Sequence, residues 1–234
     1  GAKVLYKNQF KSVGSFGDVS TWSFCQDKII TTGGEGGMVT TSNKKIWQKV
    51  WSYKDHGKDY EIVFNNEHNP GFRWLHESIG SNYRITEMQS SIGIIQLKNL
   101  NEWIEIRNRN ANILLECLSD CELIRIPKVS KNIIHAYYKF YCYLKLEMLN
   151  IDWNRDKIIK KINEEGYPAF HGGCSEIYLE KCFTKQNTHS YKRLKNAKQL
   201  GETSLMFLVH PTINTSEIFE YAMTIKNILN QASK

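Results

Sequence analysis

From residue 23 to residue 37 the chain reads Ser-Phe-Cys-Gln-Asp-Lys-Ile-Ile-Thr-Thr-Gly-Gly-Glu-Gly-Gly. Residues 19–24 are rich in β-branched and aromatic side chains and predict a strand, and residues 38–41 predict a second one. The glycine-dense run 33–37 between them predicts a loop whose backbone can approach a bound group closely. Lys28 is therefore expected near the end of the first strand, beside this loop.

The position of Lys28 allows two interpretations. A lysine at a strand end that is partly removed from water has a lowered pKa, and its neutral amine can act as an imine-forming nucleophile. Alternatively, Lys28 is an ordinary exposed lysine before a hairpin, since most lysines lie at the protein surface. On spacing alone the exposed lysine is the commoner case.

Further motifs flank this segment and follow it in order along the chain. They are residues 14–18 (Gly-Ser-Phe-Gly-Asp), 22–24 (Trp-Ser-Phe), 32–39 (Thr-Gly-Gly-Glu-Gly-Gly-Met-Val), 56–57 (His-Gly), 80–89 (Gly-Ser-Asn-Tyr-Arg-Ile-Thr-Glu-Met-Gln), 92–97 (Ile-Gly-Ile-Ile-Gln-Leu) and 208–212 (Leu-Val-His-Pro-Thr). Together with Lys28 they resemble the motifs of the DegT/DnrJ/StrS family of nucleotide-sugar aminotransferases. Ordered motifs spread over most of the chain are far more specific than any one of them.

The resemblance implies a pyridoxal 5'-phosphate enzyme of fold type I, which is an α/β fold. Residues 1–118 would form the second half of the large cofactor domain, whose sheet is mostly parallel, and would end in a long helix. Residues 119–234 would form a small C-terminal α+β domain. The resemblance covers the whole chain, but the chain corresponds only to the later part of the family's length. Such enzymes work as homodimers with shared active sites at the subunit interface.

The resemblance also assigns three residues to the cofactor. Lys28 matches the lysine that binds it covalently, and Ser23 matches a serine that binds its phosphate. Asn82 matches an asparagine that reaches the phosphate from the neighbouring subunit. Structural alternatives exist for two of them, because Ser23 can satisfy a buried strand end and Asn82 can be a turn residue before a helix.

Four further residues lie in segments that match the family's substrate cleft. Arg84 could hold a carboxylate or phosphate with its planar guanidinium, and could equally be an ion-pair partner within the fold. His56, His76 and His210 are the other three, and a lone histidine is more often a hydrogen-bonded structural residue. Residues 171–174 (His-Gly-Gly-Cys) resemble half of a metal site, but the sequence has no second half with zinc-like spacing, so we expect no metal.

The resemblance implies transfer of an amino group from an amino acid, expected to be glutamate, to a nucleotide-linked keto-sugar in polysaccharide or glycoconjugate precursor synthesis. Lys28, once released from the cofactor, would move a proton between the donor's α-carbon and the cofactor. Two alternatives stay open. Some family members dehydrate sugars, but they have histidine in place of this lysine. A non-catalytic interaction or regulatory module could also retain the fold, because fold alone does not establish function.

Composition and charge limit the partners. The 234 residues are 41% hydrophobic and 24% charged, typical of soluble globular proteins, and can bury a substantial core. The formal charge of +7 raises the question of nucleic acid. However, the lysine clusters in 157–161 and 192–198 lie on stretches with helical periodicity, where lysines usually form the solvated face, and no nucleic-acid motif accompanies them. We therefore expect no nucleic-acid partner.

The cysteines and the terminal residues of the chain suggest a cellular compartment. No run is long and apolar enough for a membrane span, the six cysteines form no Cys-x-x-Cys pair, and no signal-peptide pattern is present. We expect a reduced, cytoplasmic protein without a membrane partner. In the family, an aspartate that pairs with the pyridine nitrogen precedes a Gly-Ala that matches Gly1-Ala2. We therefore expect a truncated sequence that is inactive alone.

Periodicity and end signals predict the remaining elements. Helices are expected at 44–54, 154–165, 190–200 and 214–231, and a long helix is expected to begin at Thr86, where Gln89 completes a capping box. The helix at 190–200 should end at Gly201. Strands are expected at 123–126 and 136–146, and a long ordered loop at 60–81. The apolar residues of the long helix should face a core; they are Ile85, Met88, Ile92, Ile95, Leu100, Trp103, Ile104, Ala111, Leu114 and Leu118. Gly93 within this helix predicts close packing against another backbone.

Overall fold

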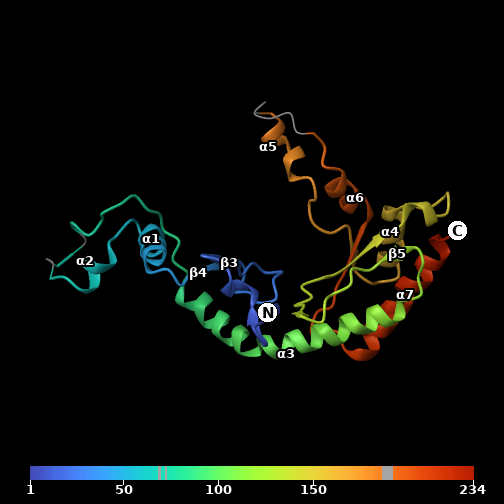
Figure 1. The fold of residues 1–234 in the computed structure, drawn as a ribbon, viewed down its shortest axis with the longest axis horizontal. Coiled ribbons are helices and arrows are strands. Elements are labelled where there is room, and N and C mark those ends of the chain that lie inside the picture. The colour runs from blue at the N-terminus through green and yellow to red at the C-terminus, as the bar shows by residue number, and fades with distance from the viewer. Residues whose placement is uncertain (68–69, 72, 186–191) are drawn as a thin grey trace. The chain divides into compact units, whose positions relative to one another are not determined.

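The computed structural model of the chain describes residues 1–67, 70–71, 73–185 and 192–234 (Figure 1). The chain divides into two compact units, one made of residues 1–102 with 132–134 and the other of residues 103–131 with 135–234. The long helix α3 (Glu87–Cys117) contributes its first part to the first unit and its second part to the other. The expected assignment of residues 1–118 and 119–234 to two family domains stays a prediction.

The first unit contains short strands and helices. These are β1 (Lys3–Tyr6), β2 (Gln9–Ser12), the 3-10 turn Val13–Ser15, β3 (Ser20–Ser23), β4 (Gly37–Thr40), α1 (Lys44–Lys54), α2 (Tyr60–Phe64), the first part of α3, and β6 (Ile133–Ile134). β1 pairs with β2 and with β6, and β3 pairs with β4. The strands predicted around 19–24 and 38–41 and the helix predicted at 44–54 are confirmed.

Strand pairing differs locally from the mostly parallel sheet expected for the family. Every pairing between named strands of the described chain is antiparallel. For β1 and β2 the reason is their two-residue connection, in which Lys7 and Asn8 both have positive φ angles of 47° and 63°. Such a tight turn reverses the chain, whereas parallel neighbours need a crossover of about a dozen residues or more.

The segment predicted as a loop at 60–81 begins with a helix, so that prediction was wrong at its start. The carboxylate of Asp59 accepts a hydrogen bond from the backbone N–H of Ile62 at 3.0 Å and caps α2. The ring of Tyr60 packs against the rings of Trp47 and Trp51, with centroids 4.9 and 5.1 Å away. Residues 68, 69 and 72 of the predicted loop lie outside the described residues.

Helix α3 begins as predicted, because Thr86 and Gln89 form both capping-box hydrogen bonds, at 3.1 and 3.3 Å. The prediction that the apolar residues of this helix face a core is only half correct. The prediction of a core face holds for the second half, where Ile104, Ala111, Leu114 and Leu118 are buried. In the first half it was wrong: Ile85, Met88, Ile92 and Ile95 are exposed, because the described chain covers this part of the helix only where the glycine loop approaches it. Leu100 and Trp103 are half-buried.

Gly93 is packed closely, but against a side chain rather than a backbone. A Cβ atom at this position would lie 3.0 Å from Cγ2 of Thr32, which is itself buried. The glycine therefore lets the side chain of Thr32 approach the helix.

The second unit is built on a four-stranded antiparallel sheet with the order β5-β7-β9-β8. Its elements are β5 (Ile124–Arg125), β7 (Phe140–Leu144), the 3-10 turn Leu146–Met148, α4 (Arg155–Glu164), β8 (Ala169–Phe170), the 3-10 turn Ile177–Leu179, α5 (Lys181–Thr184), α6 (Lys195–Thr203), β9 (Ser204–Phe207) and α7 (Thr215–Ala232). Phe140, Cys142 and Leu144 of β7 join one buried cluster with apolar side chains of α3, α4 and α7.

Local end signals identified the helices of this unit. Asn154 caps α4, Gly166 follows it with φ of 88°, and Asn214 with Glu217 forms a capping box at α7. The prediction that Gly201 ends a helix was wrong, because α6 continues to Thr203. A Cβ at Gly201 would overlap the side chain of Ser175, so the glycine serves close packing. Residues 190 and 191 of that predicted helix lie outside the described residues.

Candidate active site

The segment around Lys28 is a loop that folds back on the end of β3. The backbone N–H of Lys28 donates to the carbonyl of Cys25 at 3.1 Å and closes a turn. Phe24 anchors the rest: its N–H donates to the carbonyl of Gly36 at 2.8 Å, and its carbonyl accepts from the N–H of Thr32 at 3.2 Å. Ser23, at the end of β3, and Lys28 therefore lie on either side of Phe24 in the chain, and the backbone of Phe24 makes both of these hydrogen bonds.

The Lys28 side chain is partly open to solvent. It is 37% exposed, and its Nζ lies 3.0 Å from Oδ1 of Asp27. The hydroxyl oxygen of Ser23 accepts a long hydrogen bond of 3.4 Å from the N–H of Cys25. A primary amine that small molecules can reach thus sits in the same segment as a hydroxyl that can donate to an anion.

Helix α3 holds the glycine loop that follows Lys28. Oε1 of Gln96 accepts from the N–H of Thr31 at 3.1 Å, and Nε2 of Gln89 donates to the carbonyl of Glu35 at 2.8 Å. Gly36 permits this arrangement, because a Cβ there would overlap the hydroxyl of Thr32. Sequence reasoning assigned Gln89 only a capping role and missed Gln96. Their partners lie more than fifty residues away, which no local pattern reports.

A second group of predicted residues lies on two paired segments of the first unit. Asp55 forms a bridge with Asn82, and Lys58 forms one with His76. The N–H of His56 donates to the carbonyl of Ser81 at 3.0 Å. The structure thus brings together His56, His76, Asn82 and Arg84, which are separated by up to 28 positions in sequence.

Gly57 makes the pairing of these segments possible. It has φ of 82°, and a Cβ at this position would overlap the carbonyl oxygen of Ser78. The opposing residue is also a glycine, Gly80, where a Cβ would overlap the backbone nitrogen of Gly57. Two glycines facing each other let the backbones approach more closely than side chains would allow.

Asp55 is the charged centre of this group, and sequence reasoning missed it. Its buried carboxylate accepts from Nη1 of Arg84 at 2.7 Å and lies 3.4 Å from Nζ of Lys58. Burial opposes its ionisation, but the hydrogen bond and charge of Lys58, together with the charges of Arg84 and Lys54, outweigh burial and lower the pKa of Asp55.

Arg84 and Asn82 both make contacts within the fold. Arg84 forms the ion pair with Asp55 that was one of its two predicted alternatives, while its side chain is 45% exposed. Oδ1 of Asn82 accepts from the N–H of Arg84 at 3.3 Å, the geometry of a turn residue. The amide N–H groups of Asn82 remain as the donors suited to a phosphate, so its cofactor role stays a prediction.

His210 lies in the second unit, after β9. Its Nδ1 accepts from the backbone N–H of Thr212 at 3.3 Å and lies 2.7 Å from the Thr212 hydroxyl. Its carbonyl accepts from the buried side chain of Asn110 at 3.2 Å. Burial, aided by the charges of Arg107 and Lys139, lowers the pKa of His210. The imidazole is therefore neutral at pH 7, and its substrate role stays a prediction.

In the described ranges, no group of three or more histidine, cysteine or acidic side chains is arranged to hold a metal ion. His171, from the segment that resembled half a metal site, lies 3.1 Å from Asp156 instead. Helices long and apolar enough to cross a membrane are likewise absent from these ranges.

Known proteins resemble this chain over nearly its whole length. The family described as DegT/DnrJ/EryC1/StrS aminotransferase matches residues 2–225. The crystal structure of an aminotransferase from Psychrobacter cryohalolentis is 47% identical, with a TM-score of 0.93, over 99% of this chain and 60% of that chain. This similarity confirms the α/β aminotransferase fold expected from the sequence.

GDP-perosamine synthases are among the curated relatives with named activities. GDP-perosamine synthase from Vibrio cholerae is 34% identical over 78% of this chain and 48% of its own length. GDP-perosamine synthase from Escherichia coli O157:H7 is 35% identical over 56% of this chain and 33% of its own length. The chain spans about half the length of the curated relatives it matches.

Proposed function

This chain belongs to the DegT/DnrJ/EryC1/StrS aminotransferase family, and on that premise we propose that it serves pyridoxal phosphate-dependent transfer of an amino group to a nucleotide-linked keto-sugar. The named relatives, which are GDP-perosamine synthases, support a nucleotide sugar as the acceptor class. Glutamate is the amino donor in this proposal, and the product is an amino sugar for polysaccharide or glycoconjugate synthesis.

The observation that carries the proposal is the placement of Lys28. Its amine projects from a turn that the N–H of Lys28 closes on the carbonyl of Cys25, next to a glycine loop that α3 holds in place. Enzymes of this family depend on pyridoxal phosphate. The donor set fits this cofactor, because a lysine amine can bind an aldehyde covalently while the hydroxyl of Ser23 and the amide of Asn82 suit a phosphate.

Lys28 has two tasks in this proposal. Its amine holds the cofactor covalently, and in its neutral form it carries a proton away from the α-carbon of the donor and later returns one. When bound, the cofactor supplies an electron sink for the negative charge that develops at that carbon. Arg84, His56, His76 and His210 are proposed as substrate contacts. For Arg84 this means that a substrate carboxylate or phosphate shares the guanidinium with Asp55.

We further propose a cytoplasmic homodimer in which Asn82 of one subunit serves the cofactor of the other. In proteins that span the full length of the relatives, a mixture of Asn82→Ala and Lys28→Ala variants should then regain activity, because one hybrid site keeps both residues. The mixture is compared with each parent alone after subunit exchange has been verified by mass spectrometry of differently tagged chains. Activity that never exceeds either parent contradicts a shared site.

The direct test is covalent trapping of the cofactor. After incubation with pyridoxal phosphate and borohydride, peptide mass spectrometry should find the label on Lys28. Lys28→Ala should abolish the label, whereas Lys45→Ala, at an exposed position of α1, should keep it. In a protein that spans the full length of the relatives, Lys28→Ala should also abolish glutamate-dependent amino transfer, and Lys45→Ala should leave it unchanged. Substantial turnover by Lys28→Ala would overturn the proposal. A protein that never binds the cofactor would be the non-catalytic module instead.

A further inference from the structure

Five residues other than glycine have a positive φ angle in the described parts of the chain, namely Lys7, Asn8, His56, Trp74 and Tyr137. A positive φ is uncommon in such residues, and for a bulky side chain it is a genuine outlier. Lys7 and Asn8 form the tight turn between β1 and β2, which requires this conformation. The two large aromatic residues, Trp74 and Tyr137, need another explanation.

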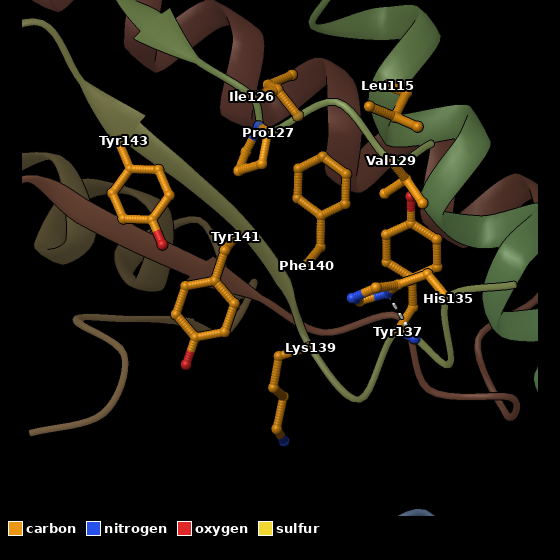
Figure 2. Close-up of a pocket in the computed structure, with 10 residues that line it drawn as sticks. All are labelled: Leu115, Ile126, Pro127, Val129, His135, Tyr137, Lys139, Phe140, Tyr141 and Tyr143. Atoms are coloured by element: carbon orange, nitrogen blue, oxygen red, sulfur yellow. Dashed lines mark hydrogen bonds between the residues drawn. The ribbon is translucent and has the colours of Figure 1, made fainter. Parts of the chain in front are cut away.

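Packing accounts for the conformation of Tyr137, which lines a hollow of about 240 Å³ in the second unit (Figure 2). The centre of its ring lies 4.3 Å from the centre of the His135 ring, and the side chain packs against the buried core. Its N–H donates to Nδ1 of His135 at 3.0 Å, and its carbonyl accepts from Nη1 of Arg107 at 3.2 Å. Contacts within the fold therefore hold Tyr137 in its strained conformation.

Trp74 differs from Tyr137 because its side chain is exposed. It has φ of 62° and an exposed fraction of 83%. A single exposed apolar residue is ordinary on a protein surface, but in Trp74 the exposure is combined with backbone strain. Strained residues persist only where the surrounding structure fixes them, and they cluster at sites that bind ligands. The exposed indole of Trp74 is therefore a candidate for contact with a ligand.

The surrounding structure does fix the backbone next to Trp74. Leu75 is buried, and its carbonyl accepts from the N–H of Asp59 at 2.9 Å. His76 forms a bridge with Lys58 on the paired segment. A tryptophan has only two side-chain torsions, so an indole on a fixed backbone loses little entropy when a ligand packs on it.

Trp74 lies at the start of the paired segments that carry most of the proposed substrate contacts. His76 follows two residues later, and the pairing of the segments brings in His56 and Arg84. His56 is itself one of the residues with a positive φ, at 61°. Two strained residues therefore belong to the same group of candidate substrate contacts.

We propose that Trp74 is a specificity-determining contact for the acceptor, with its indole face packed on a flat ring of that molecule. This inference rests on the proposed transferase function. Glutamate, the proposed donor, is small and charged and has no ring for an indole to cover. A nucleotide-linked keto-sugar has both a sugar ring and a base, and aromatic side chains pack on such rings through their faces. Trp74 is thus assigned to the acceptor alone.

The test measures donor and acceptor separately, in a protein that spans the full length of the relatives and is loaded with pyridoxal phosphate. Glutamate passes its amino group to the cofactor and leaves as the 2-oxo acid, and the absorbance of the cofactor follows this step. Trp74→Leu should leave its rate and its dependence on glutamate unchanged. Calorimetry with UDP-, GDP- and dTDP-linked hexoses that lack a keto group measures acceptor binding without turnover. Trp74→Leu should weaken that binding roughly five- to hundredfold.

Two variants and one further set of ligands sharpen the result. Trp74→Phe keeps a ring and should retain most of the affinity. Ile151→Ala removes a side chain of the second unit that is 93% exposed, and it should bind as the unsubstituted protein does. Nucleoside diphosphates without a sugar identify the ring that Trp74 covers. It is the base if Trp74→Leu weakens their binding equally, and the sugar if only the nucleotide sugars are affected.

The outcomes separate this inference from the function on which it rests. If the unsubstituted protein does not react with glutamate, the proposed function is overturned and the inference with it. If that step proceeds, the inference alone is overturned when no nucleotide sugar binds, or when Trp74→Leu and Ile151→Ala have the same affinity. It is also overturned when Trp74→Leu impairs the glutamate step as much as it impairs binding, because Trp74 would then have a structural role.

Discussion

The two units of this chain differ in the interactions that stabilise each of them. Of the buried apolar side chains in the described residues, Leu75 alone belongs to the first unit, and all others belong to the second. Both units bury polar groups, but the first unit, where these are Thr32 and Asp55, has almost no buried apolar side chains beside them and relies on glycines and backbone hydrogen bonds. The contrast teaches that Lys28 and Asn82, which carry the proposed chemistry, are positioned by hydrogen-bonded loops, whereas most of the hydrophobic stabilisation is in the other unit.

The largest expected effect comes from the core of the second unit. Phe207 in β9 is completely buried and packs edge-on against Tyr221. Phe207→Ala should cost about 3–5 kcal/mol of unfolding free energy through lost transfer energy and a cavity. Phe219→Ala, at a position of α7 that is 52% exposed, should cost less than about 0.5 kcal/mol. Urea denaturation monitored by circular dichroism measures both, and equal losses would contradict the assignment of the core.

A glycine should be the weak point of the first unit. Gly57→Ala places a methyl group where the Ser78 carbonyl lies and forces alanine into φ of 82°. The backbone strain alone is about 1–3 kcal/mol, and the pairing that carries His56 and Asn82 should open. Gly173→Ala, where a Cβ would meet nothing within 4 Å, is the control. Limited proteolysis should cut near residue 57 in the first variant and leave the second intact; equal resistance would show that the close approach is not needed.

Acid should affect the first unit through Asp55. Its folded-state pKa is lowered, so its ionised form stabilises the fold above the unfolded pKa of about 4, and this contribution is lost as the pH falls below that value. The difference in unfolding free energy between the unsubstituted chain and Asp55→Asn should therefore be greatest near neutral pH and shrink below pH of about 4. Asp152→Asn, at an exposed position, should show no such convergence. A constant difference across the range would exclude the ionised carboxylate as the cause.

Local signals predicted the elements whose information is local. The bounds of α1, the start of α3 at its capping box and the starts of α4 and α7 at asparagine caps were all readable from a few adjacent residues. Periodicity was less informative, because it tells which residues of α3 share a face but not whether anything covers that face. The prediction that a helix ends at Gly201 was wrong for a related reason. A glycine that ends a helix and a glycine that packs under a neighbouring side chain look the same in sequence.

The residues of the candidate site also fall into those that a local motif identifies and those that depend on distant contacts. Lys28 and Ser23 could be singled out because they lie in one contiguous motif, although their roles stay predictions. The groups that position this site could not. Gln96 contacts Thr31 across 65 positions, and Asp55 contacts Arg84 across 29. Such contacts form only when the loops fold back onto distant parts of the chain, and no residue spacing in a single sequence predicts them.

The smallest expected effect sharpens the comparison, because it applies the same chemistry once in each unit. Asn43 caps α1 in the first unit by accepting from the N–H groups of Lys45 and Ile46, at 3.0 and 3.2 Å. Asn214 caps α7 in the second unit by accepting from the N–H of Glu217 at 3.0 Å. Replacing either asparagine by alanine should cost about 1 kcal/mol.

What distinguishes the two cap variants is where the loss is seen. Trp47 and Trp51 lie on α1, so tryptophan fluorescence reports mainly on the first unit, while helical circular dichroism also follows α7. If the units unfold separately, Asn43→Ala should shift the fluorescence midpoint in urea and leave the dichroism of the second unit unchanged, and Asn214→Ala should do the reverse. If both variants shift both signals equally, the chain unfolds as one cooperative body. The hydrogen-bonded first unit would then draw its stability from the core of the second.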